Sequence, residues 1–152
     1  MPLRVCALAL CLASAARAAP GQDAADLACP ASLEVQEQPA TAPASPWRAL
    51  PDPGLPVRAL SAVSMLEGPP AQGARLVPDF DRKTGRQRRY GWTFKPAPPS
   101  PAPEEARWLA CSYHHTALIL VRPVPAGVKR CEVQERLLPR GRSLGIDGLR
   151  CE

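Results

Sequence analysis

Apolar and polar residues alternate with a period of two along several short segments, and that period is typical of a half-buried β-strand. The clearest case puts Tyr90, Trp92 and Phe94 on one face of a predicted strand. Strands of this kind are predicted at residues 33–36, 57–65, 88–94 and 107–113. Residues 57–65 leave a helix open as an alternative, because Ala and Leu also suit a helix.

Residues 75–94 predict a β-hairpin with a charged tip. Pro78 confines the first arm, an extended piece at residues 75–80, to a sheet edge or a bulge. Turn residues follow in "DRKTGRQ", where Gly85 can adopt a positive φ. The aromatic strand then returns toward the core.

The C-terminal third contains the strongest strand signals. The unbroken apolar run "TALILVRPV" predicts a central strand that is buried on both faces. With residues 107–113 and 128–133 it predicts a three-stranded meander, and the glycine-rich tail "RGRSLGIDGLRCE" is expected to be irregular until "LRC" closes it. The predicted fold is mainly β: one small antiparallel sheet of about five strands, with room for one short helix.

The first residues, "MPLRVCALALCLASAARAAP", have the layout of a secretory signal peptide. Arg4 supplies the positive charge, and the apolar run that follows is shorter than the roughly 20 residues a membrane-spanning helix needs. Cleavage is predicted after Ala18, and lipidation of Cys11 is the alternative. The predicted organisation is a signal peptide at 1–18, a polar lead-in at 19–28 and a β-rich domain at 29–152.

Cysteine usage agrees with export. Of six cysteines, those expected in the mature protein are Cys29, Cys111, Cys131 and Cys151. An even number in an oxidising compartment predicts two disulfides, and the wide spacing disfavours a zinc site or a CxxC redox motif. Three pairings are open. We favour Cys111–Cys131, which would tie neighbouring strands, with Cys29–Cys151, which would tie the chain ends.

Composition limits the fold class further. Proline accounts for 20 of 152 residues, far above its usual share of about 5%, so a helix-rich protein is excluded. The apolar fraction of 45% argues against full disorder. A proline-rich loop is predicted at residues 96–103.

Basic residues gather in the predicted hairpin. The formal net charge is +5, and an exported protein is not expected to meet nucleic acid. A solvated hairpin tip is the simplest interpretation, and an anionic partner is the functional one. The predicted partner-binding residues are Arg86, Arg88, Arg89, Tyr90 and Trp92.

No catalytic constellation stands out. His114 and His115 are adjacent in a predicted turn, where they cannot easily share one metal ion. The carboxylates are scattered over turns, and no G-x-S-x-G elbow is present. We therefore predict a protein that is not an enzyme, with no catalytic residue, metal or cofactor.

Several short motifs carry a family resemblance. The motifs are "CPASLEV", "LEGPP", "LVPD", "WLACSY", "RPVPAGVKRCEV" and the closing "LRC". Together they resemble a family of small exported proteins of Gram-negative bacteria, of unknown function and named only after a Salmonella locus tag. The resemblance covers residues 29–151 and implies the same four cysteines, without an activity.

These observations predict a periplasmic, non-enzymatic binding protein. Its most concrete form is an inhibitor or immunity protein that acts against an envelope hydrolase, with a periplasmic or envelope protein as partner. The alternative is an envelope-associated structural protein that binds anionic lipid or peptidoglycan.

Overall fold

The computed structural model describes residues 27–50, 56–96, 98, 102 and 104–152. The predicted signal peptide, most of the predicted lead-in and most of the proline-rich loop lie outside these residues. The predicted domain boundaries therefore remain predictions.

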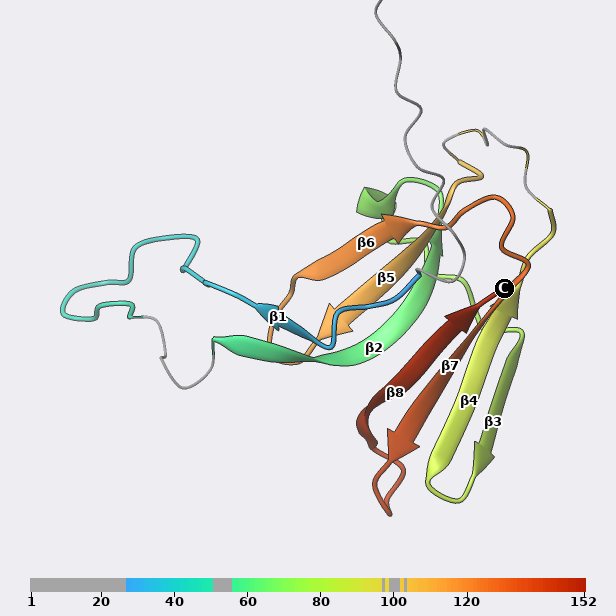
Figure 1. Cartoon of the computed structure of the whole chain (residues 1–152). Helices are drawn as coiled ribbons and strands as arrows, with labels where there is room; N and C mark the ends of the chain where they lie inside the picture. The colour runs from blue at the N-terminus through green and yellow to red at the C-terminus, as the bar shows by residue number, and fades with distance from the viewer. Residues whose placement is uncertain (1–26, 51–55, 97, 99–101, 103) are drawn as a thin grey trace, which may run out of the picture.

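Among these described residues, eight strands form two four-stranded antiparallel sheets, one in the order β1-β2-β5-β6 and one in the order β3-β4-β7-β8 (Figure 1). The strands are β1 (Ser32–Glu34), β2 (Val57–Glu67), β3 (Phe80–Thr84), β4 (Gln87–Thr93), β5 (Arg107–Tyr113), β6 (Ile119–Pro123), β7 (Arg130–Leu137) and β8 (Ser143–Cys151). The described residues add one short 3₁₀ turn, η2 (Pro70–Gln72). The mainly β prediction is confirmed, whereas a single sheet of about five strands is wrong.

The core lies between the inner faces of the two sheets. Tyr90, Trp92 and Phe94 are all buried, as the alternation of β4 predicts. The Tyr90 hydroxyl donates a hydrogen bond of 3.2 Å to the carbonyl of Val63 in the other sheet. The Trp92 indole donates one of 3.1 Å to the carbonyl of Leu76. The aromatic side chains of this strand thus connect the two sheets, and the Tyr90 hydroxyl and the Trp92 indole each have a hydrogen-bond partner.

The predicted meander at residues 107–133 is wrong. β5 pairs with β6, but β7 belongs to the second sheet. The apolar run also forms an edge strand, in which Ile119 is 38% exposed and Val121 is 39% exposed. A short apolar run shows that a strand forms, but its place in a sheet depends on distant partners.

The C-terminal tail is a regular strand, contrary to the irregular structure predicted for it. β8 runs antiparallel to β7, with register shifts beside Glu135 and Leu137. Gly145 and Gly148 lie opposite β7 next to these shifts. The glycines therefore accommodate bulges within the strand instead of ending it.

The four predicted half-cystines form two disulfides, Cys29–Cys111 and Cys131–Cys151. The favoured pairing was wrong because it assumed that β5 and β7 are neighbours. Cys131 and Cys151 instead face each other across β7 and β8. Cys111, in the other sheet, joins the segment that leads into β1.

Candidate binding surface

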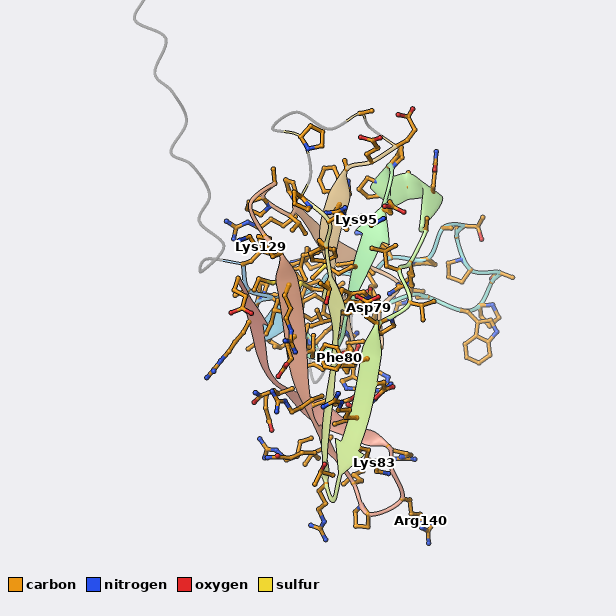
Figure 2. All side chains as sticks on the ribbon, turned by 90° about the vertical axis from the view of Figure 1, so that its right-hand side faces the viewer. Asp79, Phe80, Lys83, Lys95, Lys129 and Arg140 are labelled. Atoms are coloured by element: carbon orange, nitrogen blue, oxygen red, sulfur yellow. A yellow bond between two sulfur atoms is a disulfide. The ribbon has the colours of Figure 1, made fainter. Side chains whose placement is uncertain are left out.

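The second sheet has one apolar face and one charged face. Along β7 the buried residues alternate with polar ones. The inward side carries Cys131, Val133, Glu135 and Leu137, and the outward side carries Arg130, Glu132, Gln134 and Arg136. The strand register extends both faces across β3, β4 and β8. Figure 2 shows Phe80 midway along this sheet, with Lys83 and Arg140 toward one end and Lys95 and Lys129 toward the other.

Arg88 belongs to the inward face, where it joins three strands. Its guanidinium donates to both carboxylate oxygens of Asp81, at 2.9 and 2.6 Å, and to Glu135 at 3.1 Å. It also lies 5.0 Å from the centre of the Tyr90 ring. Glu135 is 6% exposed, so this guanidinium neutralises a buried carboxylate. Arg88 therefore has a structural role, because it links β3, β4 and β7.

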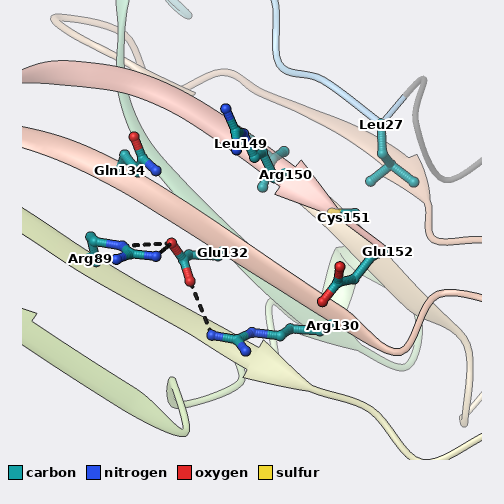
Figure 3. Close-up of a pocket in the computed structure, with 9 residues that line it drawn as sticks. All are labelled: Leu27, Arg89, Arg130, Glu132, Gln134, Leu149, Arg150, Cys151 and Glu152. Atoms are coloured by element: carbon teal, nitrogen blue, oxygen red, sulfur yellow. Dashed lines mark hydrogen bonds and ion pairs between the residues drawn. The ribbon is translucent and has the colours of Figure 1, made fainter.

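Arg89 and Arg130 point outward and share one carboxylate (Figure 3). Arg89 donates from Nε to Glu132 Oε1 at 2.7 Å and makes a second, short bond from Nη2. Arg130 donates to Glu132 Oε2 at 3.0 Å and lies 5.0 Å from the centre of the Phe80 ring. Because each oxygen of Glu132 holds one guanidinium, the two guanidiniums are fixed side by side.

Two adjoining grooves run over this outward face. One has a volume of about 470 Å³ and is lined by Leu27, Arg89, Arg130, Glu132, Gln134, Leu149, Arg150, Cys151 and Glu152. The other, of about 370 Å³, is lined by Phe80, Arg82, Arg89, Thr93, Arg130 and Glu132. We call their shared surface the arginine face, defined by Phe80, Arg82, Arg89, Arg130, Glu132 and Arg150.

The structure separates the five predicted partner-binding residues. Arg86 lies in the exposed turn at the hairpin tip and Arg89 lies on the arginine face. Arg88 points inward, and Tyr90 and Trp92 are core residues. The predicted set thus does not form one surface, and the aromatic side chains are not accessible to a partner.

Sequence reasoning missed five members of the arginine face, which are Phe80, Arg82, Arg130, Glu132 and Arg150. The signal that could have found two of them is the alternation in "RCEVQERL", which places Arg130 and Glu132 opposite the apolar side. Arg82 and Arg150 come from strands that pair with β4 and β7. Their proximity depends on sheet order, which the sequence does not show.

The arginine face offers binding chemistry. Guanidinium groups bind carboxylates and phosphates through directed N–H donors.

His114 and His115 lie exposed in the predicted turn. Within the described ranges, no cluster of side chains could hold a metal ion. No described helix is both long and apolar enough to cross a membrane.

We expect acid to weaken the fold partly through Asp81. The hydrogen bonds from Arg88 hold the pKa of this carboxyl below its ordinary value of 3.8. The unfolded chain therefore takes up this proton first as the pH falls, so the pair stabilises the fold above about pH 4 and loses its effect as the pH falls through the folded-state pKa. Between pH 7 and pH 3, Asp81→Asn should lose less unfolding free energy in urea titrations than the wild type.

Asp147 provides the matched comparison for this prediction. Its pKa is also lowered, through hydrogen bonds from Arg136 on the outward face. The Asp81→Asn variant should therefore keep part of the pH dependence. Identical losses of stability in the variant and the wild type would contradict a role for the Asp81–Arg88 pair.

The comparisons with known proteins place this fold in a family. Residues 54–152 match the family model of the Type VI secretion system Tli immunity protein. This match spans β2 to β8 and therefore includes the whole arginine face. The match supports membership of a small protein family, but it does not support the naming after a Salmonella locus tag that the motifs suggested.

A curated relative of similar molecular mass supports the assignment to a family of small proteins. An uncharacterised 16.3 kDa protein from the trpG 5′ region of Azospirillum brasilense is 34% identical over 122 residues, which cover 76% of this chain and 75% of that protein. No solved structure matches the chain. The chain belongs to the family of Type VI secretion system Tli immunity proteins.

Proposed function

We propose that this protein is a periplasmic immunity protein that protects its producer by binding a toxin delivered by a type VI secretion system. The observation that carries the proposal is the family match over residues 54–152. The toxin class that we propose is an envelope hydrolase, because an immunity protein with two disulfides fits the compartment where such an enzyme would act. Secretion through the predicted signal peptide would bring the protein there.

A binding role without catalysis is supported by the state of the charged groups. Asp81, Glu132 and Glu135 are each held in ion pairs with arginine. For Asp81, the hydrogen bonds from Arg88 lower the pKa, which makes this carboxyl a poor general acid. The protein would instead act by occupying the toxin's active site or the path to it.

A co-expression assay tests this function. Candidate toxins encoded in the producer's genome are exported to the periplasm of a sensitive bacterium, with and without this chain. We expect the chain to restore growth against one toxin and to form a complex with it in solution. A variant without residues 1–18 should fail to protect, because it would stay in the cytoplasm while the toxin is in the periplasm. Absence of both protection and binding for every candidate would contradict the immunity function.

The alternative function rests on the excess of arginine on the outward face. An envelope-associated structural protein could use this surface to bind anionic lipid or peptidoglycan. Such a protein should sediment with phosphatidylglycerol vesicles or purified sacculi at low salt and be released at high salt. It should not protect against any toxin.

A further inference from the structure

We propose that the arginine face is the toxin-docking surface and that the toxin element it binds is an acidic protein segment. The inference rests on the proposed immunity function and adds to it the surface and the chemistry of the partner. It concerns the outward side of the β3-β4-β7-β8 sheet, which is distinct from the hairpin tip at Arg86.

Charge without a partner is the first argument. Arg82 on β3 lies directly opposite Arg89 on β4, and like charges placed opposite each other destabilise a sheet. Arg89 is neutralised by Glu132, whereas Arg82 has no acidic partner among the described residues. Arg150 lies opposite Glu132 in register, yet it also forms no ion pair within the described part of the chain. A carboxylate brought by another protein would relieve this repulsion.

Preorganisation is the second argument. Glu132 has a side chain that is only 14% exposed, and it holds Arg89 and Arg130 in a set geometry before any partner arrives. The Phe80 ring supports Arg130 from the other side. Each guanidinium has five N–H donors, so donors remain for an incoming anion. Fixed arginines lose less side-chain entropy on binding than flexible lysines do.

The mixed chemistry of the grooves favours a protein over a membrane. Glu152 lies among the arginines, and its carboxylate would repel an anionic bilayer. The Phe80 ring supplies apolar contact beside the charges. Aromatic and arginine side chains together are typical of protein interfaces. The pattern therefore requires a partner whose carboxylates are placed to match.

A charge-reversal variant tests the surface. Arg82→Glu combined with Arg150→Glu removes no ion pair that the structure describes, so the fold should survive. The probe is the purified toxin against which the wild-type chain protects. We expect the variant to bind at least about tenfold more weakly, mainly through slower association. Wild-type affinity should fall as the salt concentration rises.

Arg140→Glu combined with Arg142→Glu is the matched control. It makes the same change in net charge at two exposed arginines in the turn between β7 and β8, so binding should change by less than about twofold. Equal weakening in both variants would overturn the proposal, because only net charge would then matter. Unchanged toxin binding by the first variant would overturn it as well, while protection by the wild type would keep the immunity function intact.

A cross-linking experiment tests the chemistry of the partner. Arg82→Lys combined with Arg150→Lys keeps both charges and introduces amines that a carbodiimide can couple to carboxylates. We expect these positions to become linked to Asp or Glu of the toxin, as read by mass spectrometry. Links confined to other lysines of the chain would overturn the proposal. Salt-sensitive binding of wild-type protein, but not the reversal variant, to phosphatidylglycerol vesicles would assign the surface to lipid instead and overturn it too.

Discussion

Removing the Cys29–Cys111 disulfide is expected to lower the free energy of unfolding by about 4 to 5 kcal/mol. This disulfide joins residues 82 apart in sequence and therefore closes a long loop. Removing it gives the unfolded chain more conformational freedom than removing a disulfide that closes a short loop. The Cys131–Cys151 disulfide spans 20 residues, and its loss should cost about 3 kcal/mol. Paired Cys→Ala variants avoid leaving a free thiol, and urea unfolding followed by tryptophan fluorescence measures the difference.

Two observations check this result independently. Alkylation under non-reducing conditions should find no free thiol in the purified mature protein, and peptide mapping should link Cys29 to Cys111. A reductant should bring the wild-type protein to the stability of the variant that lacks both disulfides. A larger loss from the short disulfide than from the long one, or a peptide that links Cys111 to Cys131, would contradict the structure.

Gly91→Ala is expected to destabilise the protein by about 3 kcal/mol. A Cβ atom at Gly91 would overlap the backbone carbonyl of Cys131 on β7 and lie 2.8 to 2.9 Å from the Phe80 ring. The ring can move, but the carbonyl is part of the neighbouring strand, so β4 and β7 would have to separate. Urea unfolding of the variant measures the loss.

Gly148→Ala is the matched control, because no atom lies within 4 Å of its added Cβ and it belongs to the same sheet. It should change stability by less than about 1 kcal/mol. Adding Phe80→Ala to the Gly91→Ala variant should not restore stability, since the carbonyl overlap remains. Full rescue by Phe80→Ala would show that the ring is the obstacle and that the two strands can tolerate the methyl group.

The tight approach at Gly91 also affects the proposed docking surface. Phe80 covers this glycine from the outward side, and its ring supports Arg130. A larger residue at position 91 would displace the ring and with it the guanidinium. A residue that is buried between strands thus helps to set the geometry of the arginine face.

The sequence predicted the local features of this protein, because they depend on near neighbours. The period of two in β4 predicted its buried aromatic face, and the positions of four cysteines predicted two disulfides. The mainly β class followed from the same alternation and from the proline content. Each of these signals comes from a few neighbouring residues or from the number of cysteines or prolines in the chain.

The tertiary structure decided what depends on pairing between distant segments. It placed β6 at an edge, moved β7 to the second sheet and changed the disulfide pairing. It also paired Arg88, which the alternation of β4 places on the same face as Tyr90, with Glu135, 47 positions away, and it placed Arg82 and Arg150 on one outward face. Sheet order and register are set by the packing of the whole core. No local pattern could therefore show which of these arginines has a structural role and which lies on the proposed binding surface.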